Sequence, residues 1–220
     1  MKSGDIKGAL ADHEKALAIL EKTVGSNHPD VADTHQYIGE AHEANENQTK
    51  ALECHSKALA IRSAVLGKQH PATAASCIVI AGILEQKKDY SGAKMAYRQA
   101  LTANMGLHGE NHAATADARL RLGRVLNLEQ EFKPAEEELR KSVATFEELF
   151  GAEDLRTAES YALLGTILNR QGDFEEALSF HEKALAARKE QLGDSHADVK
   201  LSATAVAVNR EGKHEDEIAL

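Results

Sequence analysis

The chain has 220 residues, of which 42% are hydrophobic and only 4% aromatic, and it contains no tryptophan. Alanine and leucine, both strong helix formers, dominate the apolar residues, so the composition favours an all-helical protein. The net charge of −9 argues against general binding to nucleic acids or anionic membranes, which requires basic surfaces. The sequence also lacks a run of about 18 apolar residues, which a membrane-spanning helix would need.

The first residues and the cysteines bear on the compartment. The segment Met1–Asp5 lacks the apolar core of a secretory signal peptide. Cys54 and Cys77 are the only cysteines, and they fall at different positions of the repeat described below. We therefore expect neither a disulfide framework nor a zinc site. Free thiols are typical of a reducing compartment, and we expect a cytoplasmic protein.

A repeat of 42 residues runs through the sequence. Glycine averages roughly 7% of residues in proteins, so five glycines in one phase are not an accident of composition. The residues in phase are Gly25, Gly67, Gly109, Gly151 and Gly193; Ala9, Ala51, Ala93, Ala135, Ala177 and Ala219; His28, His70, His112, Asp154 and His196; and Ile38, Ile80, Leu122, Leu164 and Val206. A period of this length indicates stacked supersecondary units.

Each repeat predicts two helices, which we call helix A and helix B. In the first complete repeat Pro29 marks the start of helix A, because its fixed φ and missing N–H suit a first helical turn. The polar residues 45–48 form a turn, and helix B then carries apolar residues at steps of three and four. Gly67 is expected to end helix B in a left-handed conformation.

The same pattern predicts ten helices. In chain order they cover residues 5–24, 30–45, 49–66, 72–87, 91–108, 114–129, 133–150, 156–170, 175–192 and 198–211. Because one helix pair cannot bury its own apolar stripe, we expect a single solenoid domain over residues 1–220. It comprises a helix B half-repeat, four full repeats and a degenerate or truncated repeat, namely residues 1–27, 28–69, 70–111, 112–153, 154–195 and 196–220.

Both ends of the predicted solenoid lack an evident cap. Residues 4–10 align with residues 172–178 as the start of a helix B that no helix A precedes. Residues 215–220 align with the opening turn of a further helix B. Because solenoids need polar capping units, we expect either a fragment of a longer solenoid or a chain whose ends meet another copy.

The repeat resembles the tetratricopeptide repeat in the 42-residue form found in kinesin light chains. Helix A carries a small residue in each copy, and the linker Leu66–Pro71 is of the light-chain type. The small residues are Gly39, Ala81, Gly123, Gly165 and Ala207, and the alanines near the middle of helix B are Ala16, Ala58, Ala100 and Ala184. The resemblance implies an all-α, right-handed superhelix whose concave face, lined by helices A, holds peptides or helices of partner proteins.

Arginine and amide side chains of helix A form the first candidate binding site. They occupy positions expected to point away from helix B in the third and fourth repeats. These residues are Arg121, Arg124, Asn127, Asn169 and Arg170. Guanidinium groups offer paired donors in fixed geometry, so the cluster predicts contact with an acidic peptide. Alternatively, the arginines pair with neighbouring acids such as Asp117 and Glu159.

Apolar residues of helix A form the second candidate site. Tyr37, Ile78 and Val79 fall on the same predicted face in the first two repeats. If exposed, they would make an apolar pocket beside the basic cluster, as peptide grooves often have. The alternative is ordinary packing between helices.

The eleven histidines do not form a metal motif. Those in the linkers lie at least one repeat apart, so one ion could not readily gather several of them. His13, His55 and His181 share a position of helix B with Tyr97 and Leu139, which indicates a half-buried packing position. No zinc spacing, phosphate-binding glycine loop or nucleophile motif occurs. We therefore expect no metal, no cofactor and no catalytic residue.

The leading hypothesis is a non-enzymatic scaffold or adaptor that binds a protein or peptide partner, with acidic groups of the partner at the arginines. A second is a structural solenoid that self-associates through its open ends, as heterologous interfaces permit. A third is a regulatory repeat segment of a larger multidomain protein. No nucleic acid or membrane is expected among the partners.

Overall fold

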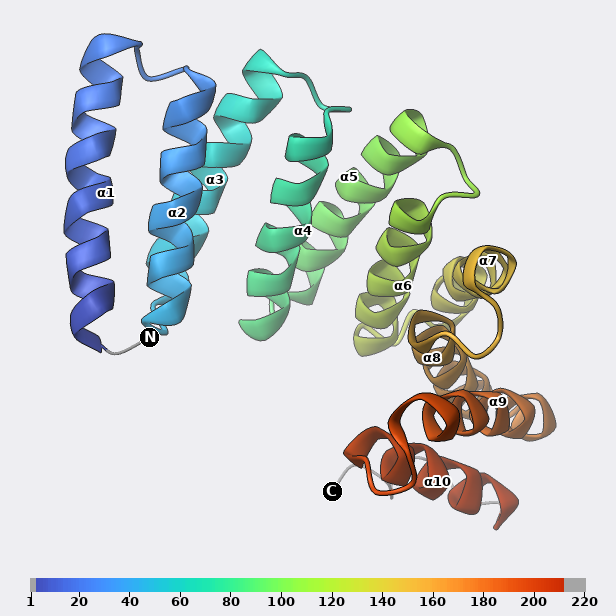
Figure 1. The fold of residues 1–220 in the computed structure, drawn as a ribbon. Helices are drawn as coiled ribbons and strands as arrows, with labels where there is room; N and C mark the ends of the chain where they lie inside the picture. Colours follow the sequence, from blue (N-terminus) through green and yellow to red (C-terminus); the bar gives the residue numbers. More distant parts are fainter. Residues whose placement is uncertain (1–2, 212–220) are drawn as a thin grey trace. The chain divides into compact units, whose positions relative to one another are not determined.

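The computed structural model describes residues 3–211, with side chains from Ile6 onward. Within this range the chain forms ten α-helices and no strand (Figure 1). They are α1 (Ser3–Thr23), α2 (Pro29–Ala44), α3 (Gln48–Val65), α4 (Pro71–Gln86), α5 (Tyr90–His108), α6 (Ala113–Leu128), α7 (Phe132–Phe150), α8 (Leu155–Gln171), α9 (Phe174–Leu192) and α10 (Ala197–Arg210). The all-helical prediction is confirmed, and the helix opening predicted over residues 215–220 lies outside the described residues.

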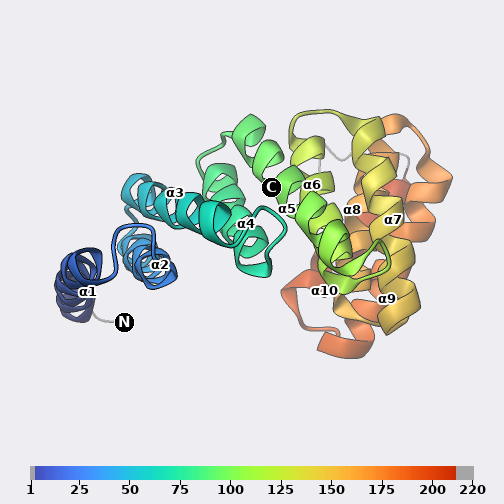
Figure 2. The same ribbon diagram turned by 90° about the horizontal axis from the view of Figure 1, so that it is seen from above.

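The chain forms two compact units, which we call unit 1 (Met1–Gly109) and unit 2 (Glu110–Leu220). In unit 1, α2 pairs with α3 and α4 with α5, while α1 packs on α2 and α3 on α4. Figure 1 shows α2 and α4 in front of α3 and α5, and Figure 2 views α1 and α2 side by side almost along their axes. In unit 2, α6 pairs with α7 and α8 with α9, while α7 packs on α8 and α9 on α10.

The residue just before each helix A caps the first turn of that helix with its side chain. In four linkers this side chain is a histidine, whose Nδ1 accepts the backbone N–H two residues on. The N···N distances are 3.2 Å at His28, 3.2 Å at His70, 3.1 Å at His112 and 3.2 Å at His196. In the remaining linker Asp154 accepts from the backbone N–H of Arg156 at 2.9 Å. The periodic histidines are therefore N-caps, which satisfy N–H groups that the helix leaves without partners.

The linker glycines end helices B with positive φ, as predicted. Gly109, Gly151 and Gly193 are the C-cap residues of α5, α7 and α9. Their φ angles are 84°, 85° and 78°, and their ψ angles are −177°, 170° and 157°, respectively. This combination belongs to a region open almost only to glycine, not to the left-handed helical region that the sequence predicted. The extended ψ leads the chain away from helix B toward the next cap.

The turn from helix A to helix B uses a residue in the true left-handed region. Glu46, Lys88 and Gln130 have φ of 58°, 61° and 63°, and Gly172 has φ 93° and ψ 4°. The following N–H bonds the carbonyl five residues back, as in Asp173 N–H to the Leu168 carbonyl at 2.9 Å. This six-to-one bond is the Schellman motif, which satisfies the last carbonyls of helix A.

Small residues of helix A bring the two helices of a repeat together. A Cβ added at Gly39, Gly123 or Gly165 would lie 2.7, 2.6 or 2.9 Å from the side chain of His55, Leu139 or His181 respectively. These three partners on helix B are all buried. The shared helix B position is therefore a core position in these repeats, more deeply buried than the sequence predicted, and His13 alone is half-buried there.

Candidate functional site

The two arginines of α6 in the candidate site carry ion pairs. Arg121 donates through Nε to Oδ2 of Asp117 at 2.8 Å, one helical turn earlier, and both side chains are 38% exposed. Arg124, also 38% exposed, lies with Nη1 4.0 Å from Oε1 of Glu159 on α8. The acids considered as an alternative to a ligand thus do contact these arginines. Because all four side chains are partly in water, both pairs are weak and exchangeable.

Arg170 contacts a different part of unit 2 from Arg121 and Arg124. It is exposed in the last turn of α8, and its guanidinium carbon is 5.8 Å from the ring centroid of Phe132 at the start of α7. This distance fits a cation–π contact. Arg170 therefore marks the end of α8, whereas Arg121 and Arg124 share the middle of α6.

Asn127 and Asn169 are buried, with 7% and 1% of their surface exposed. The equivalent positions in unit 1 hold Glu43 and Glu85. Glu43 bonds Nε2 of His55 at 2.7 Å, and Glu85 accepts from the hydroxyl of Tyr97 at 3.1 Å, in both cases on the paired helix B. This position is thus directed toward helix B in unit 1. Contact of the two asparagines with a peptide stays a prediction, and their burial leaves the arginines as the accessible part of the cluster.

The three apolar candidates belong to unit 1, whereas the arginines belong to unit 2. Tyr37 is 51% exposed and stacks on His13 of α1, with ring centroids 5.6 Å apart and planes at 22°. Ile78 and Val79 are half-buried on α4. Tyr37 is therefore accessible to a partner, while Ile78 and Val79 divide their surface between packing and solvent.

Sequence reasoning missed a buried arginine that joins three helices of unit 1. Arg62, in the last turn of α3, donates to the hydroxyl of Ser76 on α4 at 2.7 Å. It also donates to Oδ1 of Asp33 at 2.6 Å and to Oε1 of Gln36 at 2.7 Å, both on α2. A charged residue is usually expected at the surface. The signal that could have revealed it is its place on the apolar stripe of helix B.

Unit 2 has a comparable buried pair that the sequence analysis did not identify. Arg119, on α6, donates through Nη1 to Oε2 of Glu138 on α7 at 2.7 Å. Arg119 is almost fully buried, and Glu138 is largely so. The pair ties the two helices of one repeat together, so this arginine is structural and, unlike Arg121 and Arg124, not accessible to a ligand.

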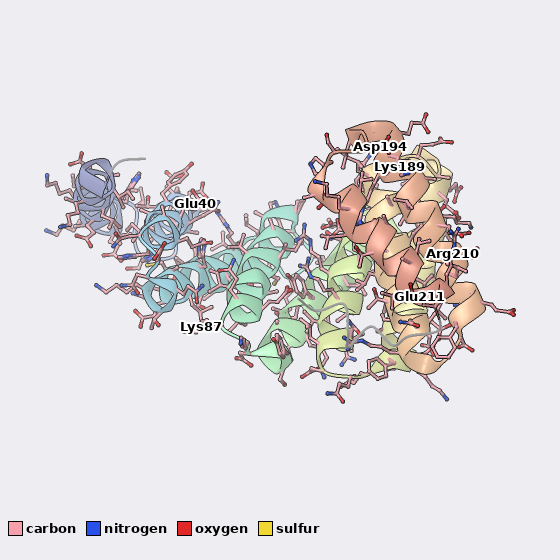
Figure 3. All side chains as sticks on the ribbon, turned by 90° about the horizontal axis from the view of Figure 1, so that it is seen from below. Glu40, Lys87, Lys189, Asp194, Arg210 and Glu211 are labelled. Carbon is pink, nitrogen blue, oxygen red and sulfur yellow. The ribbon has the colours of Figure 1, made fainter. Side chains whose placement is uncertain are left out.

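Exposed ion pairs cover helices B of unit 2. Arg140 on α7 binds Glu176 on α9 through two parallel bonds of 2.9 Å. These bonds hold the pKa of the Glu176 carboxyl below its usual range and raise the pKa of Arg140. Lys189 and Asp194 lie together at the end of α9, 3.5 Å apart (Figure 3). An exposed pair like that of Lys189 and Asp194 contributes little to stability, whereas the two parallel bonds make the pair of Arg140 and Glu176 stronger.

Among the described residues, no group of three or more His, Cys, Asp or Glu side chains is placed to hold a metal ion. Both cysteines are free, and burial raises the pKa of each thiol. Among the described helices, none combines the length and the apolar character needed to cross a membrane.

Comparison with known proteins identifies the repeat. The tetratricopeptide repeat family profile matches residues 1–61, 37–105, 80–148 and 115–190. Among curated proteins, no sequence matches this chain.

Solved structures with the same fold are distant in sequence. One is BtubC (BKLC) from P. vanneervenii, with a TM-score of 0.75 and 19% identity over 94% of this chain and 83% of the other. Another, from Podosopora anserina, is described as a kinesin light chain with nearly identical repeats, with a TM-score of 0.73 and 22% identity over 86% and 90%. The MamA protein has a TM-score of 0.61 and 20% identity over 88% of each chain. At these identities the likeness shows the fold alone.

Proposed function

Because the chain belongs to the tetratricopeptide repeat family, whose repeats imply a protein–protein interaction scaffold, we propose that the exposed side of α6 and α8 binds an acidic segment of a partner protein. The observation that supports this proposal is the pair Arg121 and Arg124. They lie three residues apart on one helix, both are partly exposed, and both are held by acids that are themselves partly exposed.

The energetics of these ion pairs favour exchange with a ligand. A surface pair four residues apart on a helix contributes about 0.3–0.5 kcal/mol, so displacing Asp117 from Arg121 costs little. A partner carboxylate that accepts two parallel bonds from a guanidinium gains more than this. Asp117 and Glu159 would then remain solvated, because both are already partly in water.

Apolar surface on the helices A of unit 2 would complete the contact. Leu201 is 61% exposed on α10, at the repeat position that Glu159 holds on α8. Leu128, in the last turn of α6, is also exposed. A segment that combines acidic and apolar side chains matches these groups. In unit 1, Tyr37, Ile78 and Val79 are proposed as a separate set of apolar contacts.

The test is a screen of fluorescent peptides by anisotropy, comparing acidic peptides with charge-reversed versions of the same length. Affinity in the micromolar range is expected for one short peptide, or about −8 kcal/mol. The variant Arg121→Glu/Arg124→Glu should weaken acidic peptides at least tenfold. Lys133→Glu/Lys141→Glu, on exposed positions of α7, makes the same charge change and should retain binding.

The control separates a local site from general electrostatics. If both double variants lose binding equally, the net charge of the chain and not the α6 face governs it. If the Arg121→Glu/Arg124→Glu protein keeps its helical circular dichroism and still binds acidic peptides at full strength, the proposed site is wrong.

A further inference from the structure

Unit 1 contains a cleft of about 540 Å³ between two helices B, floored by the helix A that lies between them in sequence. We call it the α3–α5 cleft. Its lining residues come from the end of α3, the following linker, the first half of α4 and the middle of α5; they are Ser63, Lys68, Gln69, Thr73, Cys77, Arg98, Gln99, Thr102 and Ala103. Small-molecule sites usually span about 300–1,000 Å³, so the volume suits such a ligand.

The cleft is open because Ser63 and Cys77, two of its lining residues, have small side chains. Cys77 forms its floor, and the equivalent residue in unit 2, 84 positions later, is Tyr161. The Tyr161 ring is fully buried and its hydroxyl donates to Glu147, which stands where unit 1 has Ser63. Lys183, the equivalent of Gln99, lies 5.3 Å above the same ring. In unit 2 the side chains of Tyr161, Glu147 and Lys183 therefore fill the space that forms the cleft in unit 1.

The charge of the cleft is positive. Lys68 and Arg98 line it, and no aspartate or glutamate does. Over residues 6–211, no ion pair neutralises either cation. In unit 2 the residue equivalent to Lys68 is Ala152, and the residue equivalent to Arg98 is Glu182, which binds Arg210 at 2.6 Å. Two unneutralised cations around a cleft that no acid lines attract anions.

The hydrogen bonds inside the cleft leave a defined set of donors and acceptors. The Cys77 thiol donates to Oε1 of Gln99 at 3.7 Å, so the Gln99 amide nitrogen remains as a donor. Burial raises the pKa of this thiol, so it stays protonated and keeps the amide in place. The hydroxyls of Thr73 and Thr102 donate to backbone carbonyls at 2.9 Å each, so their oxygens are left to accept.

We infer that the α3–α5 cleft binds a small polar anion, whose carboxylate or phosphate lies between Lys68 and Arg98. The Gln99 amide nitrogen donates to the same group, and hydroxyl or amino groups of the ligand donate to Thr73 and Thr102. This site is independent of the peptide site proposed on α6 and α8, because all of its residues belong to unit 1.

The test is an NMR titration of the ¹⁵N-labelled chain with citrate, with glucose 6-phosphate and with glucose. Saturable shifts of the Lys68, Gln69, Arg98 and Gln99 amides are expected with at least one of the two anions and not with glucose. The responding anion distinguishes a carboxylate site from a phosphate site. Shifts that rise without saturation and spread over all lysines and arginines would show general ion binding and overturn the inference.

Three variants locate the site. Cys77→Tyr copies the residue of unit 2 and should abolish the saturable shifts by filling the cleft. If that variant does not fold, Arg98→Gln decides the question and should weaken binding at least tenfold. Lys87→Gln removes one exposed cation outside the cleft and should leave binding unchanged. Equal affinity in Arg98→Gln and Lys87→Gln would contradict the assignment, while Arg121→Glu/Arg124→Glu should leave this site intact.

Discussion

The guanidinium of Arg62 donates to the hydroxyl of Ser76 at 2.7 Å, which connects the end of helix B in one repeat to helix A of the next. The same bond recurs at 2.7 Å between Arg188 and Ser202, three repeats later. Of these two described arginines, Arg62 also extends the connection backward, through its bonds to Asp33 and Gln36 on the preceding helix A. In unit 1 one buried cation therefore joins α2, α3 and α4.

Replacing this arginine should destabilise unit 1. Arg62→Ala removes three hydrogen bonds of a buried charged group, and we expect unit 1 to lose about 2–4 kcal/mol of unfolding free energy. Arg188→Ala, which removes one described bond from a half-buried side chain, should cost less in unit 2. Hydrogen exchange of the α3 and α4 amides measures the local effect, since arrays of repeats need not unfold in one step.

A double-mutant cycle with Ser76→Ala isolates the inter-repeat bond. We expect a coupling energy of about 1–2 kcal/mol between Arg62 and Ser76, as for a hydrogen bond to a charged donor. Additive effects of the two substitutions would mean that the bond contributes nothing to holding the repeats together.

The histidine N-caps can be compared with the aspartate N-cap of the fourth full repeat, Asp154. His70→Ala should destabilise unit 1 by about 1 kcal/mol, because the Ala72 N–H loses its acceptor. His70→Asp should retain most of the stability, since Asp154 caps α8 in the same way. Urea denaturation of both variants measures the difference. If alanine and aspartate behave alike at this position, the histidine is there for a reason other than capping.

The turn between helices A and B offers a stabilising change. Gln130 adopts φ 63° where the next repeat has Gly172 with φ 93°. Left-handed backbone costs a residue with a side chain about 1–2 kcal/mol relative to glycine, partly offset by the greater freedom of glycine in the unfolded chain. Gln130→Gly should therefore raise the midpoint of thermal unfolding, and Gly172→Gln should lower it. Shifts of the same sign in both variants would refute this account.

Two histidines should make unit 1 sensitive to acid. Burial lowers the pKa of His35 and of His42, with a further contribution from Lys57 and Lys50 respectively. The Nδ1 atom of each ring is buried without a hydrogen-bond partner. Because the folded-state pKa is the lower one, the unfolded chain binds protons more readily below about pH 6.5. Unit 1 should therefore lose stability as the pH falls from about 6.5, and the loss levels off below the folded-state pKa values.

The matched variant for this prediction is His35→Leu/His42→Leu. Its stability, followed by hydrogen exchange of α2 between pH 7.5 and 5, should depend on pH less steeply than that of the parent chain. An equally steep dependence would assign the acid sensitivity of unit 1 to other groups.

The sequence by itself determined the ten helices and the repeated start and end signals around Pro29 and Gly67. These features follow from local chemistry and from a 42-residue period, so a given residue type has the same structural role in each copy. The sequence also indicated Asp117 and Glu159 as acids that could pair with Arg121 and Arg124, and they do so; peptide contact of the two arginines stays a prediction.

Only the tertiary structure decided which polar side chains are buried and where space remains. Asn127 was expected to share the face of Arg124, yet it lies inside, and Arg62 lies among apolar residues although it is charged. Cys77 and Tyr161 hold equivalent positions, but one leaves a cleft and the other fills its place. The physical reason is that the repeat fixes where a Cα lies, whereas burial and cavities depend on the sizes and charges of side chains from neighbouring helices, which change from copy to copy.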